Sequence, residues 1–165
     1  MPVTPLHIGI PGLIGYYFPK KVDIVAAIIG SMAIDIDFFL FLLLGTPIHG
    51  CLHMLIGAAI VSIVIIPLVF FLRAPMKRIK EWFKWDTYSN FKSISLGALI
   101  GAFSHVFIDA FIYREMTPFY PLMGNPMWSA VGQYYIFIAV YALAGIATLA
   151  LLTLYIRRAV AKKSL

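Results

Sequence analysis

The chain has 165 residues, of which 62% are hydrophobic and only 12% are charged. A soluble domain carries roughly 25% charged residues, so this composition, with a mean hydropathy of +0.93, excludes an ordinary soluble fold and predicts an integral membrane protein. The single cysteine, Cys51, excludes an internal disulfide. The formal charge of +6 does not indicate nucleic-acid binding, because the basic residues flank apolar stretches, as membrane topology requires.

The first apolar stretch, residues 5–18, is too short for an ordinary transmembrane helix. Thr4 followed by Pro5 is a helix-start signal. About a dozen apolar residues follow, whereas a span needs roughly 20. We therefore expect a short re-entrant or tilted helix, which ends before Lys20 and Lys21.

Four longer apolar segments predict four transmembrane helices, at about 22–45, 51–72, 93–113 and 133–156. The basic, aromatic-containing segment 73–92 predicts an amphipathic stretch on the membrane surface, in contact with anionic lipid. The irregular loop 114–127 is expected to fold over the outer mouth of the bundle. The prediction is one all-α membrane domain, residues 1–165, with four transmembrane helices plus a short N-terminal helix.

The basic residues predict the orientation of the chain. Twelve of the 13 lysines and arginines fall on the side that holds residues 20–21, the 73–92 segment and the C-terminal tail, and only Arg114 falls on the other side. The positive-inside rule therefore predicts a multi-pass protein of the plasma membrane with a cytoplasmic C-terminus.

Metal-binding residue types are concentrated in the most apolar parts of the chain. His105 and Asp109 are four positions apart, as are His49 and His53, a spacing that places two side chains on one face of a helix. Counted along the predicted spans, Asp35, Asp37, His105 and Asp109 fall in the outer half of the bilayer, at the level where His49 and His53 begin the second span. The candidate residues are His7, Asp35, Asp37, His49, His53, His105 and Asp109.

A bound cation is the expected neutraliser of these aspartates. Each aspartate inside a membrane helix costs about 2.5–3.5 kcal/mol, and every lysine lies on the other side. Histidine with carboxylate suits Zn²⁺ best, with Mn²⁺ or Fe²⁺ as alternatives. We predict one or two ions, since paired ions recur in phosphoester hydrolysis. The predicted metal ligands are His7, Asp35, His49, His53, His105 and Asp109.

The sequence leaves two points open about the roles of these side chains. Asp35 and Asp37 point to nearly opposite faces of an intact helix, so either the helix is broken there or one of them ligates while the other bonds elsewhere. His105 and Asp109 could also act as a hydrogen-bonded pair that supports a ligand rather than ligating directly.

Four motifs resemble those of the membrane-bound metal-dependent hydrolases of bacteria and archaea, in order and separation over residues 4–126. In two places the chain departs from that pattern: Ile34 stands where many members have proline, and the second histidine motif is shorter and lacks an arginine. The last motif also resembles one in soluble helical zinc phospholipases C, which implies phosphoester chemistry. The motifs are Thr4-Pro-Leu-His7, Ile-Asp35-Ile-Asp37, His49-Gly-Cys-Leu-His53 and Ser104-His105-Val-Phe-Ile-Asp109, with Pro118 and Pro121 after them.

The sequence thus predicts a metal-dependent hydrolase of a phospholipid or other lipid phosphoester. A spare carboxylate, Asp37 or Asp35, would be the general base, and Arg114 would hold the phosphate. The alternative is a non-catalytic membrane protein, a transporter, channel or assembly subunit, whose His/Asp cluster is an ion or proton site. Membrane lipid is the expected partner, nucleic acid is not, and oligomerisation is left open.

Overall fold

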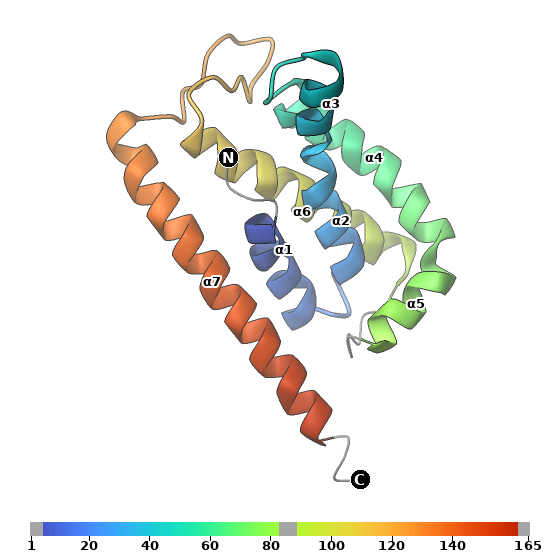
Figure 1. The fold of residues 1–165 in the computed structure, drawn as a ribbon. Helices are drawn as coiled ribbons and strands as arrows, with labels where there is room; N and C mark the ends of the chain where they lie inside the picture. The colour runs from blue at the N-terminus through green and yellow to red at the C-terminus, as the bar shows by residue number, and fades with distance from the viewer. Residues whose placement is uncertain (1–4, 83–88, 162–165) are drawn as a thin grey trace.

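The computed structural model describes residues 5–82 and 89–161, and these ranges contain helices and no strand (Figure 1). The predicted Thr4 cap, Lys84 and the last two lysines lie outside the described residues. The all-α membrane fold predicted from composition is confirmed. The elements are α1 (Pro5–Tyr17), α2 (Ile24–Ile34), α3 (Ile36–Leu44), η1 (Cys51–His53), α4 (Leu55–Phe71), α5 (Arg73–Trp82), α6 (Phe91–Ile112) and α7 (Ala130–Ala161).

Three helical segments are long and apolar enough to cross a membrane: Ile24–Leu44, Phe91–Ile112 and Ala130–Arg157. A fourth is present if α4 and α5, which are bent by 78° relative to each other, count as one span. The short α1, with 13 residues, packs against α2, α6 and α7 inside the bundle. The long α7 runs along one side of the bundle and extends beyond it (Figure 1).

Small residues bring α2 and α6 close together at the centre of the bundle. A Cβ atom on Gly101 would lie 2.0 Å from the carbonyl oxygen of Ala27, and one on Gly97 would lie 2.4 Å from that of Asp23. Gly97 and Gly101 have the small-xxx-small spacing by which membrane helices pack closely. Because the contacts advance together along both helices, α2 and α6 run parallel, and the end of α2 lies beside the second half of α6.

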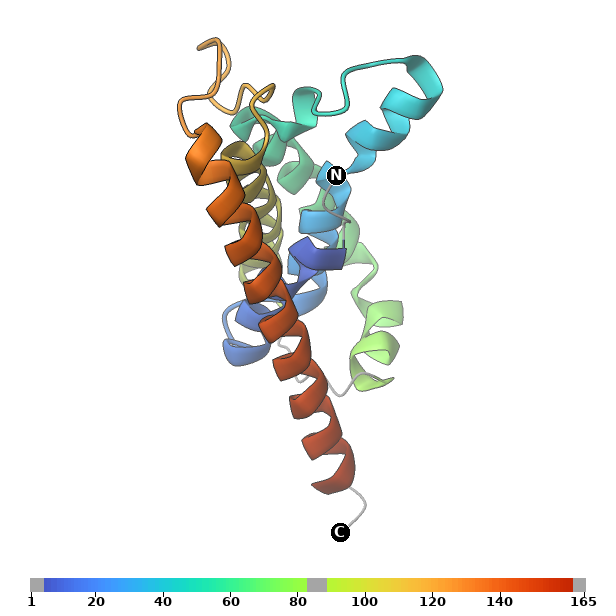
Figure 2. The ribbon, with the colours of Figure 1, turned by 60° about the vertical axis from the view of Figure 1, so that its left-hand side comes forward.

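The span that contains α2 and α3 is broken at Asp35. The backbone of Asp35 has φ −69° and ψ 0°, and its N–H donates to the carbonyl of Met32 at 3.2 Å. The sequence left open a broken helix or an arrangement in which one aspartate bonds elsewhere, and the structure shows the break together with an Asp37 that is bonded to His53. Beyond the break, α3 diverges from the bundle (Figure 2) and exposes apolar side chains such as Leu43.

One lysine of the predicted surface segment is buried. Lys80 of α5 is 6% exposed and contacts the carboxylate of Asp23 and the hydroxyl of Ser89. Asp23 itself is fully buried and caps α2 by accepting the N–H groups of Val25 and Ala26, both at 3.0 Å. A buried carboxylate needs a partner, so α5 is anchored to the bundle rather than only resting on the membrane surface.

Candidate metal centre

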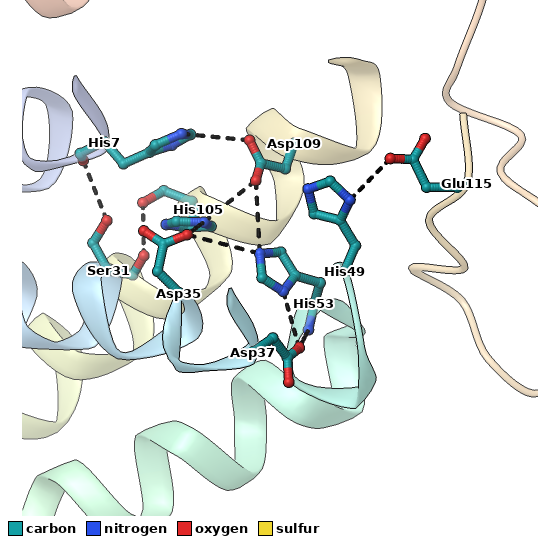
Figure 3. Close-up of polar contacts among 11 residues, drawn as sticks. His7, Ser31, Asp35, Asp37, His49, His53, His105, Asp109 and Glu115 are labelled. Carbon is teal, nitrogen blue, oxygen red and sulfur yellow. Dashed lines mark hydrogen bonds and ion pairs between the residues drawn. The ribbon is translucent and has the colours of Figure 1, made fainter. Parts of the chain in front are cut away.

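Seven titratable side chains meet at one end of the bundle (Figure 3). They come from α1, the break at Asp35, the first turn of α3, the connection to α4, and α6. All six predicted metal ligands are among them. The seven, called the His/Asp cluster below, are His7, Asp35, Asp37, His49, His53, His105 and Asp109.

The centre of the cluster is formed by two histidines and two aspartates. Nε2 of His105 lies 3.4 Å from Oδ2 of Asp109 and 3.5 Å from Oδ1 of Asp35. Nε2 of His53 lies 3.8 Å and 4.0 Å from the same two oxygen atoms. The i, i+4 spacing on α6 and the break at Asp35 therefore direct four donor atoms towards one another.

His7 extends the cluster on the other side of Asp109. Its Nε2 lies 3.4 Å from Oδ1 of Asp109, and its ring stacks on that of His105 with centroids 4.2 Å apart. Asp109 thus faces His7 with one carboxylate oxygen and the pair His53 and His105 with the other. A carboxylate in this position can hold one ion or bridge two.

The spacing of the donor atoms fits a metal ion better than a hydrogen-bond network. An N–H···O hydrogen bond joins atoms about 2.9 Å apart, whereas a tetrahedral ion with bonds of about 2.1 Å separates its ligands by about 3.4 Å. Several buried atoms have no hydrogen-bond partner, although buried polar atoms are normally bonded. Within the cluster these atoms are His7 Nδ1, Asp35 Oδ2, both ring nitrogens of His105 and Asp109 Oδ1.

The charges of the cluster also favour a bound metal ion. Among the ion pairs of the described residues, the three carboxylates of the cluster contact histidines and no lysine or arginine. Three overlapping sets of ligand atoms each lie within 4.8 Å of one another. The donor set of imidazole and carboxylate groups fits Zn²⁺, with Mn²⁺ or Fe²⁺ as alternatives. The sets are His7–His105–Asp109, Asp35–His53–His105 and His49–His53–Asp109.

Asp37, one of the two predicted general bases, is bonded to His53. Its Oδ2 lies 3.0 Å from Nδ1 of His53 and accepts the N–H groups of Leu52 at 2.9 Å and His53 at 3.3 Å. The side chain is buried, and it holds the ring of His53 so that Nε2 faces the cluster. Metal-ligating histidines commonly use such a carboxylate to fix their orientation.

His49 and His53 do not share a helix face, although their spacing favoured one. His49 lies in the loop after α3, His53 ends η1, and α4 begins only at Leu55. The N–H of Leu55 donates to the carbonyl of Pro118 at 2.9 Å. The 114–127 loop therefore holds the start of α4, and the two histidines reach the cluster from irregular backbone.

Two residues near His49 were not predicted. Nδ1 of His49 lies 3.0 Å from Oε1 of Glu115, and its ring lies 4.1 Å from that of Tyr113. Burial and then the neighbouring His53 lower the pKa of His49, which favours the neutral ring that can bind metal. Burial and then Asp109 raise the pKa of Tyr113. The available sequence signal was that Glu115 is an acidic residue directly after the His–Asp helix.

Arg114, the predicted phosphate-binding residue, is exposed at the edge of this end. Its guanidinium lies 5.2 Å from the ring centroid of Trp128. None of the ion pairs among the described residues joins Arg114 to the cluster. Phosphate binding by Arg114 therefore stays a prediction.

The chain is similar to a known family of membrane proteins. Residues 7–164 match the family model described as YdjM inner membrane protein. No curated protein and no solved structure matches the chain significantly. The family description supports the predicted membrane location and names neither a metal nor a reaction, so the predicted resemblance to hydrolases stays a prediction.

Proposed function

This chain belongs to the YdjM inner membrane protein family, and from the geometry of the His/Asp cluster we propose that it is a membrane-embedded, metal-dependent hydrolase of a phospholipid or other lipid phosphoester. Two observations support the proposal: nitrogen and oxygen atoms of the His/Asp cluster face one another at 3.4–4.0 Å, and five buried atoms of the cluster have no hydrogen-bond partner. When bound, a Zn²⁺-type ion supplies an acidic water and a charge that stabilises the phosphoester transition state.

The residues of the site have different proposed roles. His53, His105 and Asp109 would hold one ion, and His7 and Asp109 would hold a second, with His49 at the edge. Asp37 would position His53. Because Asp37 is engaged in this way, Asp35 is the better candidate for the general base, and its unbonded Oδ2 is the atom proposed to accept a proton. Arg114 is proposed to bind the substrate phosphate.

The alternative function, ion or proton transport, needs a polar path from the cluster to the lysine-bearing end. Among the described residues, the buried hydroxyls of Ser31 and Ser62 lie along the central helices in that direction. Each donates to a backbone carbonyl, that of His7 at 3.3 Å and that of Ala58 at 2.8 Å. These groups are already satisfied, which favours a site reached from one side only.

The test is phospholipid turnover by purified protein in detergent micelles supplied with Zn²⁺, Mn²⁺ or Fe²⁺. Phosphatidylglycerol and phosphatidylethanolamine are the substrates, and the released phosphorylated product is measured by mass spectrometry. Asp35→Asn should lower the rate by at least about 100-fold, the lower end of a general-base contribution. Glu81→Gln removes an exposed carboxylate from α5 and should leave the rate unchanged. A protein that binds the ion but releases no product would favour the non-catalytic alternative.

A further inference from the structure

A second polar site lies at the end of the bundle opposite the His/Asp cluster. It is a cavity of ≈ 280 Å³, close to the roughly 300 Å³ at which small-molecule pockets begin. At about 1.5 Å per helical residue, Lys92 is about 20 Å from His105 along α6, so the two sites are separate. The lining residues are Lys20, Lys21, Asn90, Lys92, Ser93 and Leu96, and we call it the three-lysine cavity.

Among residues 5–82 and 89–161, no carboxylate pairs with a lysine of the three-lysine cavity. None of its lysines takes part in an ion pair among the described residues, where the pairs of lysine are Lys77 with Glu81 and Lys80 with Asp23. Asp23 is the nearest carboxylate along the chain, but it is fully buried and occupied by Lys80, Ser89 and two backbone N–H groups. The cavity therefore attracts an anion.

The walls of the cavity are held in place before any ligand binds. The N–H of Lys21 donates to the carbonyl of Phe18, and the N–H of Asp23 donates to that of Ser93, both at 2.9 Å. Asn90 and Ser93 form a capping box at the start of α6, where the helix dipole adds positive potential. A preformed cavity loses little entropy when it binds its ligand.

Exposed apolar side chains next to the cavity identify the kind of anion. The aromatic residues Tyr17, Phe18 and Phe91 are 60%, 54% and 61% exposed, and such residues mark the membrane–water interface. Leu96 lines the cavity and Leu99 follows it one turn later on α6, with 41% and 39% exposure. A ligand with a charged head and acyl chains would place the head among the lysines and the chains along these leucines.

We infer that the three-lysine cavity binds the phosphate of an anionic phospholipid such as phosphatidylglycerol. Basic pockets beside transmembrane helices bind lipid headgroups of this class. The lipid would belong to the leaflet that the positive-inside rule assigns to the cytoplasm. Free phosphate offers the same anionic chemistry without acyl chains, and the experiment below separates the two sources. The inference does not depend on the proposed hydrolase.

The experiment counts lipids bound to the purified protein by native mass spectrometry in detergent. The probes are phosphatidylglycerol, the zwitterionic phosphatidylcholine, and inorganic phosphate as competitor. The cavity variant carries Lys20→Gln, Lys21→Gln and Lys92→Gln. The matched control carries Lys77→Gln, Arg78→Gln and Arg157→Gln, which removes the same charge from exposed positions outside the cavity.

Phosphatidylglycerol should bind at least tenfold more tightly than phosphatidylcholine. Each lysine near an anionic headgroup is worth about fivefold in affinity, so the cavity variant should bind about 100-fold more weakly, and Lys92→Gln alone about fivefold. Equal binding of the two lipids, or an equal loss in the matched control, would overturn the inference. If inorganic phosphate competes as well as the lipid does, the cavity is a free-phosphate site and the lipid assignment is wrong.

Discussion

The two ends of this bundle bury charge in different ways. At the lysine-bearing end, the carboxylate of Asp23 is surrounded by Lys80, Ser89 and two backbone N–H groups, so the protein itself supplies every partner. At the other end, the carboxylates of Asp35 and Asp109 face histidines at 3.4–4.0 Å, and each has an oxygen without a hydrogen bond.

This difference distinguishes a structural charge from one that awaits a ligand. A buried charge is tolerated when it is paired and hydrogen-bonded. The Asp23–Lys80 pair is paired and hydrogen-bonded within the chain, and it anchors α5. The carboxylates of the His/Asp cluster are fully paired only if a cation binds among them. Each end can therefore be perturbed separately. Substitutions at the lysine-bearing end should lower stability, and substitutions in the His/Asp cluster should lower metal binding.

The largest expected effect is on stability at the lysine-bearing end. Asp23→Ala leaves the buried charge of Lys80 without its carboxylate, which should lower the free energy of unfolding by about 3–5 kcal/mol. The measurement is denaturant unfolding in detergent. Lys77→Ala removes one partner of the exposed Lys77–Glu81 pair and should cost at most about 1 kcal/mol. Equal effects of the two substitutions would contradict the structural role of Asp23.

Metal should stabilise the protein through the cluster end alone. Zn²⁺ at about 100 times its Kd should raise the free energy of unfolding by about 2.7 kcal/mol. The same increment is expected in Asp23→Ala, since that substitution does not touch the cluster. It should be absent in His53→Ala/His105→Ala. Thermal denaturation with and without Zn²⁺ measures it, and stabilisation of the double variant would show that the ion binds elsewhere.

Asp37→Asn tests the residue that positions His53. Asparagine keeps an oxygen for the N–H groups of Leu52 and His53 but loses the charge that orients the imidazole. Metal affinity should fall by about 10- to 100-fold, as measured by competition with a chelating dye. An affinity equal to that of the wild type would leave Asp37 free to act as the general base instead.

Glu115→Gln should have the smallest effect. The side chain of Glu115 is 63% exposed although it contacts His49, and exposed pairs contribute at most about 1 kcal/mol. Metal affinity should therefore change by less than about fivefold in the same dye competition. A loss of metal affinity larger than that caused by Asp37→Asn would contradict this account and would indicate that the ion binds closer to His49.

The sequence predicted the fold class and the membership of the cluster more fully than its arrangement. Hydrophobic run length is enough to predict membrane helices, and the i, i+4 spacing of His105 and Asp109 fixes a shared face on α6 because that helix is regular. Asp35 and Asp37 could not be assigned in this way. Their different positions arise from a helix break at Asp35, and the apolar residues around it carry no glycine or proline that would predict a break there.

Contacts between distant segments were the part that sequence patterns could not supply. Lys80 and Asp23 are 57 residues apart, and a lysine in a basic amphipathic segment is normally solvated. Glu115 and Tyr113 reach His49 only because the 114–127 loop packs against the start of α4. Neither contact leaves a periodic pattern, so only the tertiary structure shows them.

The most direct test of the central claim is the metal content of the protein purified in detergent without chelator, measured by elemental mass spectrometry. The wild type and Cys51→Ala, which removes an exposed thiol, should each carry one or two ions of zinc, manganese or iron per chain. His53→Ala/His105→Ala should carry none. A wild-type protein without stoichiometric metal, or a double variant that keeps it, would contradict a metal centre formed by the His/Asp cluster.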